Sequence, residues 1–420
     1  MTDFSRPVHP NVSLSSTEFW SGAPATREHT YAILRNECPV SWQKPPEITL
    51  APSDRESGYW AVVRHKDIVT VSRDNANFCS GQGVQLDDIP LDLQQRLVSF
   101  LVMDPPRHTQ LRRVVSSAFT PRRVAEMEES LRKRSSIIVD DLIEMGPCDF
   151  VENVAYRLPL WTITDMMGIA EADRRHLAML ADSITGRGDP EVGADTQSLQ
   201  VVLSALEELE AVGREMISLR HRSPGEDLIS ALVQSDVDGE RLSDTDALSV
   251  FVVLILGGFD NTRHTTSHGM KALSDNPDQK AKFAVAFDRK QKTAVEEIIR
   301  WASSTPTMRR TASRDTAIAG VPILAGEKVV LFYHSGNRDE AVFEQPECFN
   351  IDREPNPHVA FGGGGIHHCI GAPLARAQLR SIFRELLARI PDIEVDDPTY
   401  AVSDVLQGIK SMPCKFARPH

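Results

Sequence analysis

The chain has 420 residues, of which 41% are hydrophobic and 25% charged, and its formal net charge is −13. This composition is typical of a soluble globular protein with a large buried core. The excess of 59 acidic over 46 basic residues argues against a nucleic-acid or anionic-membrane partner. No signal peptide is indicated, and the longest apolar run, residues 251–256, is far shorter than the ~20 residues that cross a bilayer. Six scattered cysteines favour reduced thiols, so we expect a cytoplasmic protein.

Helical periodicity dominates the chain, with apolar residues at three- and four-residue spacings, and the strand-like pieces are short. In chain order we expect a strand at 59–64, helices at 124–145, 199–220, 244–273 and 293–301, strands at 316–318 and 328–332, and a helix at 372–390. No repeat or linker divides the sequence. We therefore predict a polar arm at 1–14 and one mostly α domain with a small β portion at 15–420.

Two segments are predicted to be loops. Residues 39–56 contain four prolines and indicate irregular surface structure. Residues 344–365 are rich in turn formers, end in four glycines and lead directly to Cys369. Loops of this length inside a compact domain are usually functional or disordered, and the cysteine favours function here.

Cys369 lies in the segment Phe361-Gly-Gly-Gly-Gly-Ile-His-His-Cys369-Ile-Gly-Ala-Pro-Leu-Ala. Glycines let the backbone approach a flat, bulky group. The helix predicted to follow has a partial positive charge and free amide donors at its N-terminus. Both stabilise a thiolate, which is the form of cysteine that ligates metal.

Three alternative roles for this segment are weaker. An isolated cysteine is most often a buried structural residue. A phosphate-binding loop favours a lysine after its glycines. Zinc ligands are normally separated by two or more residues, whereas His367, His368 and Cys369 are adjacent, and a zinc protein would be colourless. None of the three accounts for the whole segment.

The segment resembles the haem-binding loop of the cytochrome P450 superfamily, and the resemblance extends from about residue 15 to the C-terminus. Glu297-Ile-Ile-Arg300 looks like the family's Glu-x-x-Arg pair, whose members share one helix face. Arg353 looks like the third member of that structural group. The resemblance implies a P450-like single-domain fold and haem b as cofactor, with Cys369 as the axial ligand to its iron.

The resemblance also implies which residues bind the rest of the cofactor. Haem has two propionates, which need cationic or hydrogen-bonding partners. The propionate candidates are His108 and Arg112 of a His-x-x-x-Arg pattern, Arg310 and His367, and Gly371 is a further cofactor-binding candidate.

The chain departs from its family in the helix that the resemblance places over the haem. The family usually has Ala-Gly-x-Glu/Asp-Thr-Thr there, and this chain has Gly-Gly-Phe-Asp-Asn-Thr at 257–262. Asn261 stands where the family has its oxygen-activating threonine, and an amide is not a comparable proton relay to a hydroxyl. The predicted catalytic residues are Asp260, Asn261 and Thr262, and the predicted substrate-pocket residues are Gly257, Gly258 and Thr307.

Two interpretations of Asn261 are open. In the first, Asn261, a water or Thr262 replaces the missing hydroxyl, and the enzyme inserts one oxygen atom into a lipophilic small molecule such as a terpenoid, branched lipid, steroid or secondary metabolite. In the second, a substrate with its own weak N–O bond undergoes rearrangement, cyclisation or nitrene-type transfer at the haem. We predict the first, because one residue type at one position is weak evidence for a new reaction.

Other features resemble the bacterial branch that oxidises methyl-branched lipids and sterol side chains. They are the distance from Phe361 to Cys369 and the sequences at 295–302 and 336–339.

No flavin or iron–sulfur motif is present, so we expect ferredoxin and ferredoxin reductase as separate partners. A basic docking surface for an acidic ferredoxin is predicted from Arg107, Arg112, Arg113, Arg122, Arg123, Arg376, Arg380 and Arg384. A haem-thiolate sensor would need an attached signalling module, for which the sequence leaves no room.

Overall fold

The computed structural model describes residues 6–47, 49, 57–96, 99–186, 189, 196–237 and 240–417. Its α-helices are α1 (Thr17–Ser21), α2 (Pro24–Glu37), α3 (His65–Arg73), α4 (Leu91–Arg96), α5 (Arg107–Ser116), α6 (Pro121–Met145), α7 (Arg157–Met166), α8 (Glu171–Thr185), α9 (Thr196–Arg222), α10 (Leu228–Gln234), α11 (Asp244–Gly258), α12 (Asp260–Asp275), α13 (Pro277–Val285), α14 (Phe287–Ala302), α15 (Tyr333–Gly336) and α16 (Ala372–Arg389). Short 3₁₀ segments are Phe100–Val102 and Ser117–Phe119, and Val151–Ala155 is a π-helical turn.

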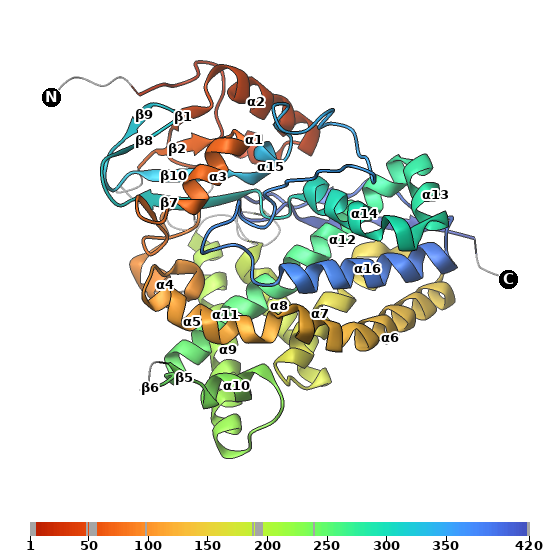
Figure 1. Ribbon diagram of the computed structural model, residues 1–420. Coiled ribbons are helices and arrows are strands. Elements are labelled where there is room, and N and C mark those ends of the chain that lie inside the picture. Colours follow the sequence, from red (N-terminus) through yellow and green to blue (C-terminus); the bar gives the residue numbers. More distant parts are fainter. Residues whose placement is uncertain are drawn as a thin grey trace.

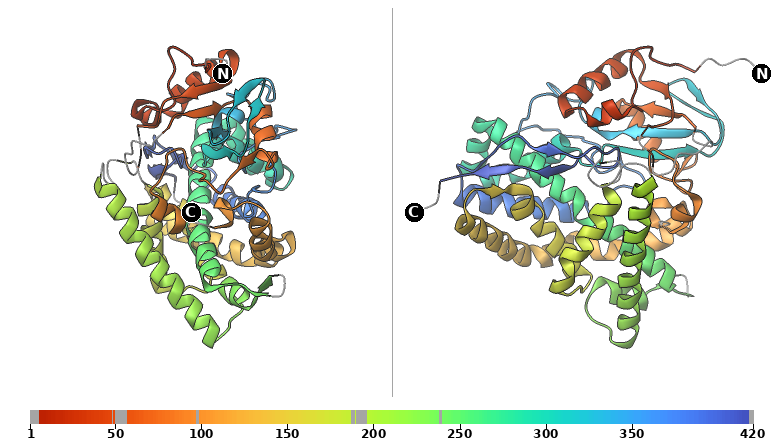
Figure 2. Two further views of the ribbon diagram at one scale, coloured as in Figure 1. Left: turned by 90° about the vertical axis from the view of Figure 1, so that its left-hand side faces the viewer. Right: turned by 180° about the vertical axis from the view of Figure 1, so that it is seen from behind.

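The strands are β1 (Val40–Gln43), β2 (Tyr59–Val62), β3 (Phe78–Cys79), β4 (Cys148–Asp149), β5 (Asp236–Val237), β6 (Glu240–Arg241), β7 (Thr307–Ala312), β8 (Thr316–Ile318), β9 (Val321–Ile323), β10 (Lys328–Phe332), β11 (Glu394–Val395), β12 (Thr399–Tyr400), β13 (Ile409–Ser411) and β14 (Pro413–Lys415). The largest sheet has the order β1-β2-β10-β7-β3. Only β2 and β10 pair in parallel within it. The sheet lies with α1, α2, α3 and α15 beside a larger helical part (Figures 1 and 2).

The helical part is built around α11 and α12, which follow one another through the middle of the molecule (Figure 2). α12 packs against α14 and α16, and α16 packs along α6. Pro373 occupies the first turn of α16, where its missing N–H would have no helical partner. The hydroxyls of Ser135 and Ser381 lie 2.8 Å apart where α6 meets α16.

The predicted fold class is confirmed, and several predicted elements match closely. The helices expected at 124–145, 199–220, 293–301 and 372–390 correspond to α6, α9, α14 and α16, and the strands correspond to β2, β8 and β10. The single helix expected at 244–273 is wrong in one respect, because the backbone breaks at Phe259 (φ −111°) and separates α11 from α12. The expectation of irregular structure at 39–56 is also wrong in part. β1 lies there and pairs with β2, while residue 48 and residues 50–56 lie outside the described residues.

The stretch Asp244–Asp275 is long and apolar enough to cross a membrane by length and composition alone. Half of its most apolar window is buried inside the protein, as in the core helix of a soluble protein. Its side chains include the fully buried Val250, Phe251 and Leu273. The apolar character of this stretch is therefore accounted for by the core.

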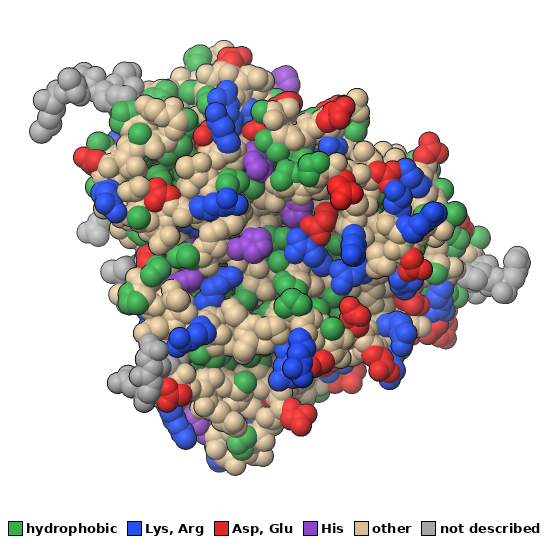
Figure 3. Space-filling view, in the orientation of Figure 1, with side chains coloured by type: hydrophobic (Ala, Val, Ile, Leu, Met, Phe, Trp, Pro, Cys, Tyr) green, Lys and Arg blue, Asp and Glu red, His purple; other side chains and the backbone are tan. Residues whose placement is uncertain are grey.

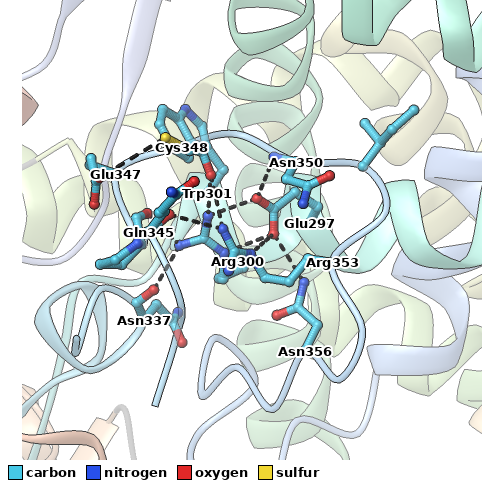
Figure 4. Close-up of polar contacts among 12 residues, drawn as sticks. Glu297, Arg300, Trp301, Asn337, Gln345, Glu347, Cys348, Asn350, Arg353 and Asn356 are labelled. Atoms are coloured by element: carbon cyan, nitrogen blue, oxygen red, sulfur yellow. Dashed lines mark hydrogen bonds and ion pairs between the residues drawn. The ribbon is translucent and has the colours of Figure 1, made fainter. Parts of the chain in front are cut away.

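A buried ion-pair network joins α14 to the long loop that precedes α16 (Figure 4). Glu297 is 0% exposed, and Arg300 donates to both of its carboxylate oxygens at 2.8 and 2.7 Å. Arg353 Nε donates to the same carboxylate at 3.1 Å. The backbone N–H of Asn350 and the amide of Asn356 complete its hydrogen bonds, at 2.9 and 3.1 Å.

The two arginines use their remaining donors on backbone carbonyls of the same loop. Arg300 donates to the carbonyls of Asn337, Pro346 and Cys348, at 2.9, 3.0 and 3.4 Å. Arg353 donates to those of Glu344, Gln345 and Cys348, at 2.7, 3.1 and 3.0 Å. Because a loop has no partner strand or helix to satisfy its polar backbone, these side chains take that role.

We expect Glu297→Gln to lower the free energy of unfolding by ~3–5 kcal/mol, because two buried guanidiniums would lose their counter-charge. Denaturant unfolding followed by circular dichroism measures the change. The control is Glu129→Gln, which removes an exposed pair with Lys133 on α6 and should cost under ~0.5 kcal/mol. Equal effects of the two substitutions would contradict the structural role of the network.

Candidate active site

The glycine-rich segment that leads to Cys369 (residues 361–369, the cysteine loop) approaches α3 so closely that Gly363 and Gly365 have no room for a side chain. A Cβ on Gly365 would lie 2.2 Å from the carbonyl oxygen of Ser72, and one on Gly363 would lie 2.6 Å from the Ser72 hydroxyl. Both glycines have positive φ, at +75° and +67°. The loop then returns so that the N–H of Cys369 donates to the carbonyl of Phe361 at 2.9 Å. These contacts place Cys369 just before the first turn of α16.

Cys369 is exposed to a cavity, although protein surrounds it on its other sides. Burial raises the pKa of its thiol above the ordinary value. The N–H groups of Gly371 and Ala372 and the charge of Arg112 oppose that effect, but burial outweighs them. The helix N-terminus therefore stabilises the thiolate as predicted, but its effect on the pKa is smaller than that of burial. A metal cation that binds such a thiol displaces its proton.

The cavity over Cys369 contains about 1450 Å³ of empty space, its mouth included. Its walls come from segments far apart in the sequence: α5, α11, α12, the chain between α14 and β7, and the cysteine loop. Among the predicted cofactor-binding residues, Arg112, Arg310, His367 and Gly371 line it together with Cys369.

The predicted propionate-binding residues form one cluster at the edge of this cavity. His108 lies one turn before Arg112 on α5, and its ring contacts that of His367, with centroids 4.3 Å apart and the ring planes tilted by 51°. Neither ring nitrogen of either histidine has a hydrogen-bond partner among the described residues. Burial, followed by repulsion from Arg310 and His108, lowers the pKa of His367 to about 3, so it is neutral at pH 7. Buried donors without acceptors are costly, so this cluster is complementary to an acidic ligand.

Asp260 begins α12 and is 0% exposed. Arg263 lies 2.6 Å from one carboxylate oxygen, and the Thr185 hydroxyl donates to the other at 2.7 Å. Arg263 also pairs with Asp182 at 2.8 Å. Burial raises the pKa of Asp182 to about 6, with Arg263 opposing the rise and Asp260 adding to it. Arg263 therefore bridges the predicted acid, Asp260, and a second carboxyl whose pKa is raised by burial.

Asn261 lies in the first turn of α12 and lines the cavity. Its side-chain oxygen accepts hydrogen bonds from the hydroxyls of Thr305 and Ser304, at 2.8 and 3.2 Å. The hydroxyl of Thr265 donates to the Asn261 backbone carbonyl at 2.7 Å and lies 3.3 Å from that of Ser304. Thr262, the third predicted catalytic residue, also lines the cavity and is 7% exposed.

Sequence reasoning missed Thr265, Ser304 and Thr305, which supply hydroxyls where the family motif has lost one. The repeated threonines after Asn261 were the available signal for Thr265, which lies one helical turn on. Ser304 and Thr305 lie 43 and 44 residues away from Asn261 in the chain, so no local pattern connects them.

A second, largely apolar cavity adjoins the first and contains about 1280 Å³ of empty space, its mouth included. Gly257 and Asn261 line both cavities, whereas Thr307 lines only the second. A Cβ on Gly257 would meet nothing within 4 Å, so this glycine leaves open space. Gly258 differs, because a Cβ there would lie 2.8 Å from Ile163. Besides lining the first cavity, Gly258 therefore allows α7 to pack closely against α11.

Comparison with known proteins agrees with this architecture. A family model described as cytochrome P450 matches residues 291–390. The chain is 38% identical over 411 residues to a methyl-branched lipid omega-hydroxylase of Mycobacterium tuberculosis, covering 97% of this chain and 95% of that protein. It is 37% identical over 385 residues to a steroid C26-monooxygenase of Mycolicibacterium smegmatis, covering 90% and 88% of the two chains. The chain belongs to the cytochrome P450 family.

The fold of this P450 is also similar to that of CYP268A2 of Mycobacterium marinum, whose structure is in complex with pseudoionone. The TM-score is 0.95, with 48% identity over 98% of this chain and 100% of that one. As a member of the family it is a haem-thiolate monooxygenase that uses haem b. The unpartnered ring nitrogens beside two arginines fit a cofactor with two carboxylates. In the described part of the chain, no three His, Cys, Asp or Glu side chains are placed to bind a metal ion together.

We expect Cys369→Ala to abolish the strongly red-shifted Soret band that the reduced P450 forms with carbon monoxide, because that band requires a thiolate ligand. The control is Cys348→Ala. It changes an exposed cysteine in the long loop that leads to Cys369 and should leave the band in place. Absorption spectra of the reduced proteins measure it. A normal band in Cys369→Ala would show that another residue ligates the iron.

Proposed function

We propose that this P450 inserts one oxygen atom into a branched, lipophilic substrate that occupies the second cavity, with Cys369 as the axial ligand of haem b. The observation that carries this proposal is the junction of the two cavities above Cys369. Both are lined by Leu101, Val253, Gly257, Asn261, Thr305 and Met308. When bound through the thiolate, haem b supplies the redox chemistry that reduces dioxygen.

Other residues of the chain bind the cofactor and support the loop that carries Cys369. In the proposal, His108, Arg112, Arg310 and His367 bind the propionates, and Gly371 presents its N–H to the cysteine sulfur. Glu297, Arg300 and Arg353 support the cysteine loop. Residues 15–420 act as one catalytic domain preceded by a short arm.

The substrate class follows from the lining of the second cavity. Half of the residues that line it are leucine, isoleucine or valine, from α4, α8, α9 and α11 and from the segments at 84–89, 101–102 and 405–406. Its polar lining residues include Gln85, Gln94 and Arg96, in or near α4, and also Thr185, Ser249, Thr307 and Asp404 on other segments. Such a wall stabilises a mostly apolar molecule that carries a few polar groups. A methyl-branched lipid or a sterol side chain fits this description. These substrate classes agree with the names of the two relatives, a methyl-branched lipid omega-hydroxylase and a steroid C26-monooxygenase.

The hydroxyls around Asn261 favour oxygen insertion over the rearrangement of an N–O substrate. Thr265, Ser304 and Thr305 all line the cavity above Cys369, and each can pass a proton. Asp260 is linked through Arg263 to Asp182, whose side chain is 39% exposed. In the proposal, Asp182 is the surface end of proton delivery, and these hydroxyls are its end in the cavity above Cys369.

We expect turnover of a methyl-branched fatty acid by the wild-type enzyme to require dioxygen. Asn261→Thr should keep this requirement and couple electrons to product as well or better, because it restores a hydroxyl at the position. Parallel assays in air and under nitrogen measure product and oxygen uptake. Product formed without dioxygen, together with increased uncoupled oxygen uptake in Asn261→Thr, would contradict the proposal and favour group transfer.

Electron delivery is proposed to come from a separate ferredoxin and ferredoxin reductase, in the cytoplasm. The predicted arginines lie on α5, α6 and α16, where basic and acidic side chains alternate on the surface (Figures 1 and 3). Most are paired: Arg107 with Asp246, Arg376 with Glu296, and Arg384 with Asp288. Arg122 and Arg123 share Glu126 and are 90% and 67% exposed. The basic surface is therefore weaker than the arginines alone indicate, and these two side chains are among its most accessible charges.

Charge reversal tests this surface. We expect Arg122→Glu with Arg123→Glu to slow reduction by an acidic ferredoxin about tenfold or more at low salt, and the difference should shrink as salt screens the charges. Stopped-flow reduction in the presence of carbon monoxide measures the rate. Arg175→Glu on α8, also exposed and paired, is the control and should change the rate little. A rate that is independent of both salt and these substitutions would contradict the proposed docking surface.

A further inference from the structure

The chain between α14 and β7 is held in place by the same network that supports the cysteine loop. Ser303 ends α14 in the left-handed conformation (φ +42°), with its N–H on the carbonyl of Ile299 at 3.1 Å. Asn337 donates to the Ser303 hydroxyl at 2.8 Å, and the carbonyl of Asn337 accepts from Arg300. The N–H of Gln407 donates to the carbonyl of Ser304 at 2.8 Å. Ser304 and Thr305 are therefore presented to α12 from a fixed backbone.

The hydroxyls of Thr305 and Ser304 both donate to the side-chain oxygen of Asn261. A side-chain carbonyl oxygen has two lone pairs, and the hydrogen bonds from Thr305 and Ser304 use both. The amide nitrogen lies 3.5 Å from the carbonyl of Gly257, which can only accept. The amide is therefore oriented with its oxygen toward these hydroxyls and its nitrogen toward the Gly257 carbonyl in the last turn of α11. Gly257 and Asn261 both line the cavity above Cys369.

We propose that Thr305 and Ser304 are positioning residues that orient the Asn261 amide, so that its NH₂ group is a fixed hydrogen-bond donor to a small ligand bound on the iron above Cys369. The inference rests on the proposed roles of Cys369 and Asn261, and it deepens the proposed function. A preorganised donor stabilises a partly negative oxygen without reorganisation. The amide thus contributes a hydrogen bond, and the surrounding hydroxyls contribute exchangeable protons.

Infrared spectroscopy of the reduced, haem-loaded protein with carbon monoxide tests this orientation directly. A donor near bound carbon monoxide lowers its C–O stretching frequency, so the band reports on the amide without turnover. We expect one narrow band in the wild type. Thr305→Val removes one hydroxyl at nearly constant volume and should reduce the population of the wild-type orientation about tenfold, because one buried hydrogen bond is lost. A second band at higher frequency should appear.

Three further variants make the result specific, and a fourth removes the amide itself. Thr305→Ser retains a hydroxyl and should restore the wild-type band. Ser304→Ala should shift the band in the same direction as Thr305→Val. Thr164→Val removes a buried hydroxyl on α7 that bonds the carbonyl of Leu160 and lines neither cavity, and it should leave the band unchanged. Asn261→Ala should abolish the low-frequency band altogether.

The inference is overturned if Thr305→Val and Ser304→Ala both keep the wild-type band while Asn261→Ala loses it, since the amide would then be oriented by other groups. It is also overturned if Asn261→Ala leaves the band unchanged, since the amide would not reach the ligand. Should Thr305→Val fail to take up haem, Ser304→Ala decides. The proposed function fails on a separate observation, the absence of dioxygen-dependent oxidation of a lipid, which the infrared band does not report.

Discussion

The carboxylate of Glu297 is the group on which the geometry of the site depends. It is fully buried, and burial of a charge is unfavourable unless paired charges and hydrogen bonds compensate it. Arg300 and Arg353 provide the charges, and the backbone and side chain of neighbouring loop residues provide further donors. Removal of one member would leave the others as uncompensated buried charges. The network therefore stabilises one loop conformation against all alternatives.

Both sides of the reaction site are connected to this network through Asn337. The side-chain oxygen of Asn337 accepts from the N–H of Val359, which precedes the cysteine loop, at 2.6 Å. Its amide nitrogen donates to Ser303, which fixes the chain carrying Ser304 and Thr305. One buried asparagine thus relates the position of the thiol to the position of the hydroxyls opposite it. The departure at Asn261 is accommodated within a framework that is otherwise typical of the family.

Local sequence patterns predicted those parts of the structure that depend on local physics. The spacing of apolar residues predicted α6, α9 and α16. The glycines before Cys369 were predicted to approach a flat, bulky group, and the close contacts that Gly363 and Gly365 make are with Ser72 of α3. β1 was missed because nearby prolines obscured a four-residue strand that β2 stabilises by pairing. The hydroxyls of Ser304 and Thr305 were missed because their contact with Asn261 is tertiary. Residues that modify a known site from a distant segment leave no periodic signal.

The source of the inserted oxygen atom tests the central claim most directly. The haem-loaded enzyme would be incubated with a methyl-branched fatty acid, a ferredoxin and its reductase under dioxygen labelled with oxygen-18, in unlabelled water. Mass spectrometry of the product distinguishes the sources. The structure, with proton-donating hydroxyls over the thiolate and an apolar cavity beside them, predicts one labelled oxygen in the product. A product whose oxygen is unlabelled, or one that forms equally well without dioxygen, would contradict the account.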